Sequence, residues 1–258
     1  QLTYLNILKT LLNHKMNIVI PMAGKSSAFK EVGIDTPKPF IDIKGKSMIQ
    51  RAYESIGLPG TYYFIVLKEH EEKYNAYNHI TSFCPDAKIQ IIDEVTSGPA
   101  ETLYKIKGFI DDTKPLLQTN VDQILDWEPE RFLKFLKEKD PDGAVVTINT
   151  CNPHYSFVAT TQQSIATNFA EKQVISNHGL IGTHYWKSPD LFFTSFTNAR
   201  KKGYTWPNSA GEDEIYVSLT YNDLLDRQYV IYDYKFKQHE KQHVVGSLDE
   251  LRIYETQL

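Results

Sequence analysis

Strand-like and helix-like segments alternate along the chain from Met16 onward, and this alternation limits the folds open to it. Five short apolar runs rich in β-branched residues indicate strands, and helical apolar spacing follows each of the first four. The expected strands cover residues 17–21, 62–67, 88–92, 115–120 and 143–149, and the expected helices cover 48–56, 68–78, 99–106 and 129–139. Strand–helix–strand units of this kind build a mostly parallel sheet with helices on both faces. The sequence therefore predicts an α/β fold.

The second half of the chain has more β character than the first. Further strands are expected over residues 156–160, 170–174, 180–186 and 228–234, and helices over 188–201 and 214–225. The sequence shows no internal repeat and no Pro/Ser-rich linker. It therefore predicts one α/β domain over residues 16–258, which carries a small β-rich lobe, rather than two independent domains.

Residues 1–15 differ from the rest of the chain. Leu5, Leu8, Leu11 and Leu12 could share one face of a short helix, but Asn6 and Lys9 interrupt the apolar run. The segment also lacks the basic start of a signal peptide. We expect the functional start at Met16 and interpret the preceding segment as a leader or upstream extension outside the domain.

Composition narrows the function classes. The chain has 28 Lys and Arg against 32 Asp and Glu, a formal charge of −4, whereas general nucleic-acid binding is associated with a basic surface. It has no apolar run of the length that crosses a membrane. Cys84 and Cys151 form no metal-binding or redox motif, which is typical of free thiols in a reducing compartment. We expect a cytoplasmic globular protein without nucleic-acid or membrane partners, and the oligomeric state stays open.

The first strand leads into a loop of small residues that suits a phosphate group. Small side chains let backbone N–H groups approach a phosphate, and open α/β sheets bind ligands beyond the carboxyl ends of their strands. The loop residues are Ala23, Gly24, Lys25, Ser26 and Ser27. Lys38, which lies between two prolines, adds a cation on a stiff backbone. An ordinary surface loop can have the same composition, so this pattern alone leaves both interpretations open.

Two acidic positions extend the candidate site. Asp122 follows the fourth expected strand, where a carboxylate can bind Mg²⁺ if substrate phosphates and water complete the coordination. A strand-end Asp is also common as a turn residue. Glu171 and Lys172 are adjacent on a later strand, so we expect their side chains to point to opposite faces. One could bind substrate hydroxyls while the other contacts a phosphate, or both could lie at a solvated edge.

Six segments in this order resemble the nucleoside-triphosphate transferases that activate sugar phosphates and related phosphate monoesters. The resemblance spans Met16 to about Leu251 and points to the branch found in bacterial capsule and lipopolysaccharide gene sets. The matching segments are the Pro21–Phe29 loop with Pro37-Lys38-Pro39, Ser97–Thr102, Asn120–Gln123, Ala170–Lys172, Gly182–Tyr185, and a helix with Glu214, Tyr216, Val217, Tyr221 and Asn222. Each segment is weak alone, but their order and spacing favour one fold.

The resemblance implies a Rossmann-like nucleotidyltransferase fold of the GT-A type with a small acceptor lobe. It also implies a Mg²⁺-dependent reaction in which a phosphate monoester attacks the α-phosphorus of a nucleoside triphosphate (NTP) and pyrophosphate leaves. CTP is our first candidate, because this branch resembles cytidylyltransferases such as the one that activates glutamine phosphate. UTP or dTTP with a hexose 1-phosphate is the alternative.

The resemblance also assigns roles to individual residues. Residues 23–27 would hold the triphosphate, with Lys25 and Lys38 neutralising phosphate charge and Asp122 holding Mg²⁺. Gly98, Ala100 and Asn120 would contact the nucleotide. Glu171 and Lys172 would bind the acceptor. Apart from the resemblance, the stretch from Trp206 to Glu214 could form an acceptor-side lid in which these two residues bind substrate, or a loop packed on the following helix.

The sequence departs from the family pattern at three places. Ser26 stands where the loop usually has a second Gly, and Ala28 stands where it has an Arg that contacts phosphates. Lys25 or Lys30 could replace that Arg, although lysine lacks its bidentate fork. A C-terminal metal-binding Asp has no counterpart, and His243 is the nearest replacement with metal-ligand chemistry.

These departures leave two further hypotheses. One is a glycosyltransferase that uses a nucleoside-diphosphate sugar, because Asn120-Val121-Asp122 resembles its D-x-D metal motif. The Pro37–Pro39 segment and the early small-residue loop argue against it, since such an enzyme needs no triphosphate site. The other hypothesis is a catalytically impaired homologue that binds nucleotides without turnover.

Overall fold

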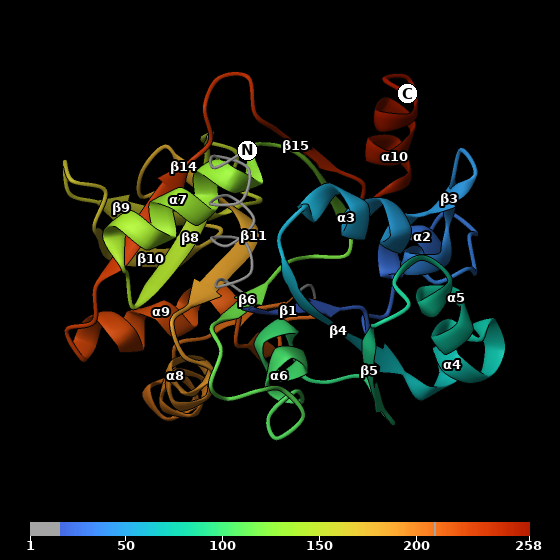
Figure 1. Cartoon of the computed structure of the whole chain (residues 1–258), viewed down its shortest axis with the longest axis horizontal. Coiled ribbons are helices and arrows are strands. Elements are labelled where there is room, and N and C mark those ends of the chain that lie inside the picture. The colour runs from blue at the N-terminus through green and yellow to red at the C-terminus, as the bar shows by residue number, and fades with distance from the viewer. Residues whose placement is uncertain (1–15, 209) are drawn as a thin grey trace, which may run out of the picture.

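The computed structural model describes residues 16–208 and 210–258, so the expected extension over residues 1–15 lies outside the described residues. Its centre is a nine-stranded mixed sheet in which β10, β9, β11, β6, β1, β4 and β5 are neighbours in that order. Strand β8 also pairs with β11, and β14 pairs with the other edge of β8. The α/β prediction is therefore confirmed (Figure 1).

The sheet combines a parallel region with an antiparallel one. Strand β1 pairs in parallel with β4 and β6, β4 with β5, and β8 with β14, whereas β11 runs antiparallel to β6, β8 and β9. The strands are β1 (Met16–Pro21), β4 (Gly60–Leu67), β5 (Lys88–Ile92), β6 (Leu116–Gln118), β8 (Gly143–Asn149), β9 (Ser156–Thr160), β10 (Ala166–Glu171), β11 (His178–Trp186) and β14 (Ile231–Lys235).

Helices cover both faces because the central strands are apolar on both sides. Val19 of β1 packs in one buried cluster, whereas Ile18 and Ile20 pack in another. The first cluster includes residues of α6 (Pro99–Tyr104), α8 (Pro189–Lys202) and α9 (Val217–Asp226), and the second those of α3 (Met48–Ile56), α5 (Ala76–Phe83) and α7 (Pro129–Lys139). Figure 1 shows α3 and α7 above the central strands and α6, α8 and α9 below them.

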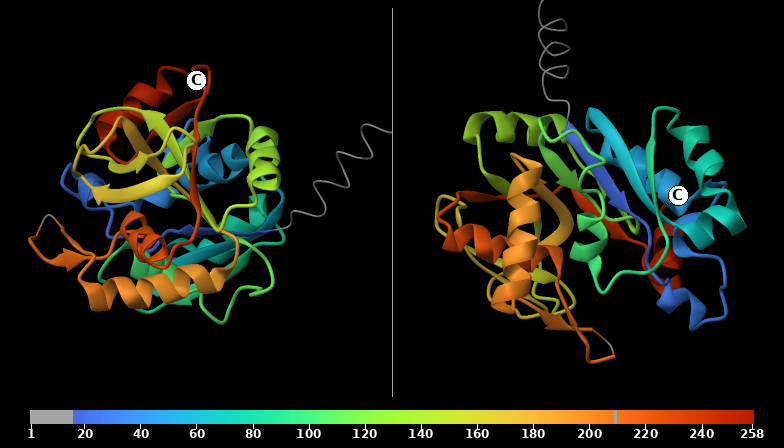
Figure 2. Two further views of the ribbon diagram at one scale, coloured as in Figure 1. Left: turned by 90° about the vertical axis from the view of Figure 1, so that its left-hand side faces the viewer. Right: turned by 90° about the horizontal axis from the view of Figure 1, so that it is seen from below.

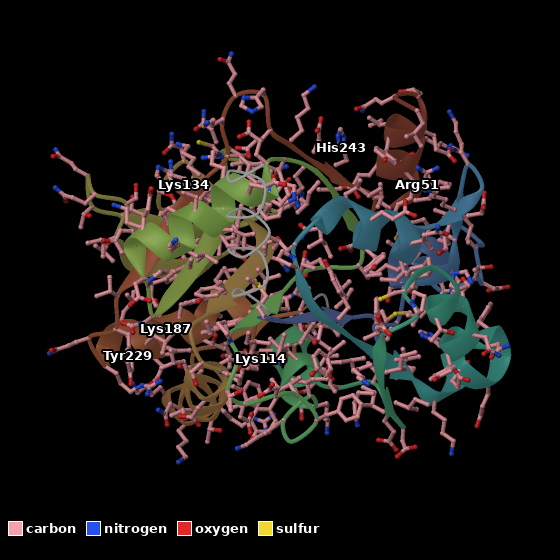
Figure 3. The ribbon with its side chains drawn as sticks, viewed as in Figure 1. Arg51, Lys114, Lys134, Lys187, Tyr229 and His243 are labelled. Atoms are coloured by element: carbon pink, nitrogen blue, oxygen red, sulfur yellow. The ribbon has the colours of Figure 1, made fainter. Side chains whose placement is uncertain are left out.

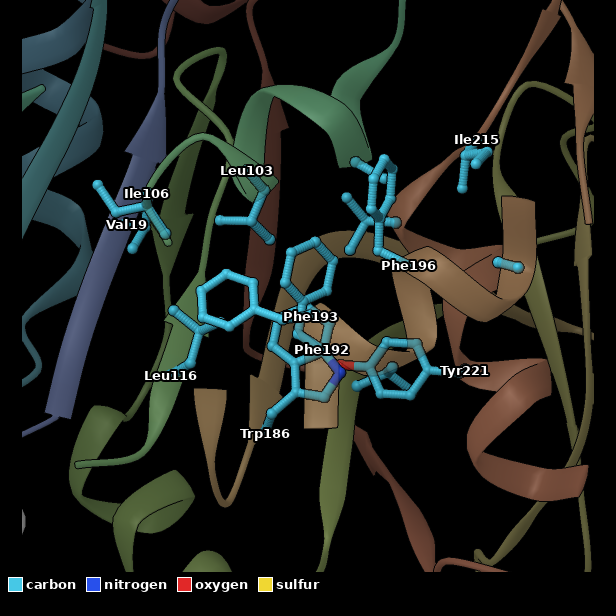
Figure 4. Packing of buried hydrophobic residues seen from close by; sticks show 14 of the residues in the cluster. Val19, Leu103, Ile106, Leu116, Trp186, Phe192, Phe193, Phe196, Ile215 and Tyr221 are labelled. Carbon is cyan, nitrogen blue, oxygen red and sulfur yellow. The ribbon is translucent and has the colours of Figure 1, made fainter. Parts of the chain in front are cut away.

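Aromatic residues dominate the cluster beneath α8 and α9. Trp186, at the end of β11, stacks on Tyr221 of α9 with ring centroids 5.1 Å apart, and Phe192 lies 4.9 Å from Trp186 (Figure 4). All three side chains are fully buried. Large buried rings of this kind contribute most to a core. This packing fixes the position of β11 in the sheet.

Most of the expected elements are present, but some of their bounds differ from the expectation. The helix expected over 68–78 is two helices, α4 (Lys68–Tyr74) and α5, because Asn75 adopts a left-handed conformation with φ 48°. Strand β10 begins four residues before the expected strand 170–174 and ends at Glu171. The strand expected over 228–234 begins at Ile231, after a turn in which Gln228 has φ 64°.

The C-terminal segment folds back onto the end of the parallel region. Strand β15 (Lys241–Val244) pairs antiparallel with β7 (Gln123–Asp126), which follows β6 in the chain. Helix α10 (Leu248–Glu255) then begins with a reciprocal capping box between Ser247 and Glu250. Its Leu251 packs in a third cluster with Phe29 of α2 (Ser27–Lys30). The chain end therefore contacts the loops that follow β1 and β6.

Among the helices of the described part of the chain, none combines the length and apolarity that crossing a membrane requires.

Candidate active site

Two adjoining cavities lie over the carboxyl ends of the parallel strands. The first, which we call the β1 cavity, has a volume of about 1020 Å³ and includes the loop after β1. The second, the β11 cavity, has a volume of about 850 Å³ and lies over β11. Residues on the border line both cavities: Pro99, Gln118, Asn120, Asp122, Lys172, Tyr216 and Val217. Two ligands could therefore meet at this border.

The small-residue loop forms one wall of the β1 cavity. Ala23, Gly24, Lys25 and Ser27 line it. Ser26 is buried and adopts a left-handed conformation with φ 56°, which glycine adopts without steric cost. Its Oγ accepts a hydrogen bond of 3.0 Å from the backbone N–H of Lys38. Ser26 thus ties the loop to the lysine segment instead of facing the cavity.

Lys38 and Asp122 form an ion pair at the border of the two cavities. Lys38 begins a single 3-10 turn, η1 (Lys38–Phe40), and its Nζ lies 2.6 Å from Oδ2 of Asp122. Burial alone would raise the pKa of Asp122, but the Lys38 ammonium outweighs it and lowers that pKa below its ordinary value. About a quarter of each side chain is exposed, so both remain accessible from the cavity.

The C-terminal segment packs against Asp122. The backbone N–H of Val245 donates to the Asp122 carbonyl oxygen at 2.9 Å. A Cβ on Gly246 would lie 3.0 Å from Oδ2 of Asp122 and 3.6 Å from Oε2 of Glu250. Gly246 therefore leaves room for the carboxylate, and α10 brings Glu250 to the same wall. Glu250, which our sequence analysis missed, was signalled by the S-x-x-E capping pattern of Ser247 and Glu250.

The Asn120 side chain packs against an irregular part of β11 at Gly182. The register between β11 and β8 shifts between Leu180 and His184, and Gly182 there has φ 77°. A Cβ on Gly182 would lie 2.3 Å from Nδ2 of Asn120, so only glycine allows this approach. Gln118 Nε2 donates to Oδ1 of Asn120 at 2.9 Å. Asn120 is thereby fixed on the border between the cavities.

Glu171 and Lys172 both line the β11 cavity, against our expectation that they point to opposite faces. The reason is that β10 ends at Glu171 and Lys172 has φ 52°, which breaks the strand alternation. Lys172 Nζ donates to the Tyr216 hydroxyl at 3.1 Å. Burial raises the pKa of Glu171, although the hydroxyls of Ser156 and Ser218 donate hydrogen bonds to it.

Amide and hydroxyl groups form the floor of the β11 cavity. Gln242 Nε2 donates to Oε1 of Gln123 at 2.9 Å, and its own Oε1 accepts from the Tyr155 hydroxyl at 3.3 Å. Gln123 Nε2 in turn donates to the hydroxyls of Thr119 and Thr183. A connected neutral network of this kind holds side chains in one arrangement. The floor of the cavity is therefore a preformed neutral surface, to which the lining adds the charged side chains of Asp122, Glu171, Lys172 and Glu250.

His184 of β11 also lines this cavity and makes the stability of the fold depend on pH. Its side chain is buried between aromatic rings, and burial lowers its pKa to about 3. In the unfolded chain the histidine pKa is about 6.5. Below that pH the unfolded state therefore binds a proton that the folded state does not bind, and stability falls as pH falls.

Between pH 6 and pH 4, we expect the unfolding free energy of the wild type to fall more steeply with decreasing pH than that of a His184→Phe variant. The difference between the two slopes should be about 1 kcal/mol per pH unit. Phenylalanine keeps the aromatic packing and removes the titration. Urea unfolding at several pH values measures the difference, since all other titrating groups are shared. Parallel pH curves for the two proteins would contradict this expectation.

Four residues from the sequence analysis lie elsewhere than expected. Ala100 is buried, and its backbone N–H donates to the Ile215 carbonyl oxygen. Trp206 and His243 line neither cavity, and His243 lies on β15 beside Tyr254 of α10 (Figure 3). Glu214 lines the β1 cavity and not the β11 cavity. The structure thus brings together Lys25, Lys38, Asn120, Asp122, Glu171 and Lys172 around the two cavities.

Comparison with known proteins identifies the family of this chain. The model of the nucleotidyl transferase family matches residues 18–239. Bifunctional protein GlmU of Methanocaldococcus jannaschii is 27% identical over 140 residues, which cover 52% of this chain and 33% of that protein. The matched stretch is therefore about one third of that relative. The chain belongs to the nucleotidyl transferase family.

Solved structures share the fold at low sequence identity. The nucleoside-diphosphate-sugar pyrophosphorylase from Vibrio cholerae RC9 superposes with a TM-score of 0.78 at 20% identity, covering 93% of this chain and 99% of that one. The inositol-1-phosphate CTP transferase from T. maritima gives a TM-score of 0.74 at 11% identity, covering 94% of each chain. These structures support the fold of the whole described domain.

Proposed function

We propose that this protein transfers a nucleoside monophosphate from an NTP, with CTP as the first candidate, to a small phosphate monoester. The acceptor would be a sugar phosphate or an amide phosphate such as glutamine phosphate. The product would be an activated metabolite for capsular or other surface polysaccharide. The observation that carries the proposal is the pair of adjoining cavities, which share the border containing Asp122 and Lys172 beside Lys38.

The β1 cavity has the groups that a triphosphate needs. Lys25 and Lys38 supply positive charge, and the small residues of the loop leave backbone N–H groups accessible. Ala28 is exposed and does not line the cavity, so Lys25 is the cation that we assign to the outer phosphates. The β11 cavity would hold the acceptor, with Lys172 on its phosphate and Glu171 on its hydroxyl or amide groups.

In this arrangement the protein aligns two phosphates and offsets their charge. An oxygen of the acceptor phosphate forms a bond to the α-phosphorus, and the bond from that phosphorus to the bridging oxygen of the β-phosphate breaks. Pyrophosphate leaves with that electron pair. Such transfers need little covalent assistance, so alignment and charge neutralisation supply most of the rate. Lys38 lines the β1 cavity and Lys172 lines both cavities, so both lysines are available at the border where this bond exchange would occur.

Mg²⁺ is the cation that this chemistry uses, and the residues present fit it. Asp122 offers a hard carboxylate oxygen, and Mg²⁺ commonly binds through one or two carboxylates with substrate phosphates and water. Within residues 16–208 and 210–258, no group of three or more His, Cys, Asp and Glu side chains could enclose a metal ion alone. Asp122 would therefore hold Mg²⁺ together with the nucleotide, and the ion would neutralise phosphate charge.

The Lys172→Ala variant tests the acceptor assignment. Among the described residues, Lys172 is the lysine that lines the β11 cavity, and it also lies on the border with the β1 cavity. We expect KM for the acceptor to rise about tenfold or more and KM for the NTP to rise much less. Lys187, which is labelled in Figure 3 and pairs with Asp140 at the surface, provides a matched control as Lys187→Ala. A rise confined to the nucleotide KM would contradict the assignment.

Ligand-induced thermal stabilisation tests the proposed nucleotide site. CTP, UTP, dTTP, GTP and ATP would each be added with and without Mg²⁺, and the melting temperature recorded. A ligand at 100 times its Kd stabilises the folded state by about 2.7 kcal/mol, which is several degrees for a domain of this size. We expect a shift with CTP and Mg²⁺. No shift with any triphosphate would contradict the proposal.

A further inference from the structure

The β1 cavity contains an acidic side chain where the nucleoside part of the ligand would lie. We propose that Glu214 accepts a hydrogen bond from the exocyclic amino group of cytosine and thereby selects CTP over UTP and dTTP. This inference rests on the proposed function and adds a side chain that reads the base. It changes the place of Glu214 from the acceptor side, where the sequence analysis put it, to the nucleotide side.

Position is the first argument. Glu214 lies in strand β13 (Asp213–Glu214), which pairs with β12 (Trp206–Pro207) in a hairpin that projects from the body of the molecule (Figure 2). A Cβ on Gly98 would lie 3.2 Å from Cβ and 3.5 Å from Cγ of Glu214. The Glu214 side chain therefore lies directly against the Gly98 turn, and both residues line the β1 cavity.

The distribution of charge in the cavity is the second argument. Lys25 and Lys38 come from the loop after β1 and from η1, and Lys172 lies on the border with the β11 cavity. Asp122 is paired with Lys38. The charged side chains that the hairpin places on this cavity are all carboxylates: Glu212, Asp213 and Glu214. A triphosphate is drawn to the lysines and repelled by the carboxylates. The ribose and base are then left with the wall formed by the Gly98 turn and Glu214.

Hydrogen-bonding capacity is the third argument. Oε1 of Glu214 accepts from Nδ2 of Asn208 at 2.9 Å, which fixes the side chain. Among the described residues, Oε2 has no hydrogen-bond donor. A carboxylate can accept from the 4-amino group of cytosine. Uracil and thymine present a carbonyl oxygen at that position, which the carboxylate repels. An unpartnered acceptor beside the base therefore favours the amino-bearing pyrimidine.

Isothermal titration of the full chain with CTP, UTP, dTTP and ATP in the presence of Mg²⁺ tests this inference. We expect the wild type to bind CTP at least about tenfold more tightly than UTP or dTTP. In Glu214→Gln the ratio of the CTP and UTP dissociation constants should fall to within about threefold, because an amide can accept from the amino group or donate to the carbonyl. Glu214→Ala should also lose the preference, because CTP loses its hydrogen-bond acceptor and UTP is no longer repelled.

Glu94→Gln is the matched control. Glu94 is exposed in the loop before the Gly98 turn and lines neither cavity, so it removes the same charge without contacting the base. We expect it to keep the wild-type preference. Equal binding of CTP and UTP by the wild type, ATP binding as tight as CTP binding, or a full CTP preference in Glu214→Gln would each overturn this inference alone. Failure of every triphosphate to bind would instead overturn the proposed function.

Discussion

An Asp122→Asn variant is expected to lose Mg²⁺-dependent turnover, with kcat lower by about 10²–10³-fold. The amide keeps the shape of the side chain but removes the negative charge that would hold the metal with the nucleotide. The substitution also removes the ion pair with Lys38 Nζ, which lies 2.6 Å away. Steady-state pyrophosphate release measures turnover, and the Mg²⁺ dependence of CTP binding gives a readout that is independent of catalysis.

Asp126→Asn is the control for this variant, because Asp126 is exposed at the end of β7 and lines neither cavity. It should retain wild-type turnover and Mg²⁺ dependence. If Asp122→Asn kept the same kcat and the same half-saturating Mg²⁺ concentration as the wild type, Asp122 would have no role in metal binding.

A Lys38→Ala variant should lower kcat by about 10²-fold or more, which is the scale for losing one preorganised charge at a reacting group. Ser26 and the two flanking prolines hold the Lys38 backbone in place. Movement of this segment should therefore not compensate for the missing ammonium group. Removal of the ammonium also leaves Asp122 without its cation. We therefore expect Mn²⁺ to bind the nucleotide-free variant more tightly than the wild type, as measured by electron paramagnetic resonance.

The Lys30→Ala variant separates this effect from a general loss of positive charge near the loop. Lys30 is exposed at the end of α2 and lines neither cavity. Equal kcat values for Lys38→Ala and Lys30→Ala would show that Lys38 does not contact the reacting phosphates.

The sequence predicted several strands of the central sheet well because they are short apolar runs rich in β-branched residues. The expected strands 88–92, 143–149 and 156–160 agree with β5, β8 and β9 at both ends. The terminal elements β15 and α10 were missed, since β15 is short and polar and pairs with a strand more than a hundred residues earlier. Pairing over that distance leaves no local periodicity to detect.

The candidate site was predictable where it depends on chain order and not where it depends on backbone conformation. The loop after β1 and the residues after β6 face the same cavity because parallel strands end on the same edge of a sheet. The shared orientation of Glu171 and Lys172 depends on the positive φ of Lys172, which no spacing rule gives. The hydrogen bond that the Ser26 hydroxyl accepts from the backbone N–H of Lys38 is likewise a contact visible only in three dimensions.

The most direct test of the central claim is the identity of the products formed from CTP. The protein, CTP and Mg²⁺ would be incubated with single phosphate monoesters, including glutamine phosphate and hexose 1-phosphates, and pyrophosphate and nucleotide products quantified by mass spectrometry. We predict one pyrophosphate for each cytidine diphosphate-linked product, formed only when a suitable monoester is present. Nucleotide binding without pyrophosphate release for any NTP, or consumption of a nucleoside-diphosphate sugar instead, would contradict the proposed nucleotidyl transfer.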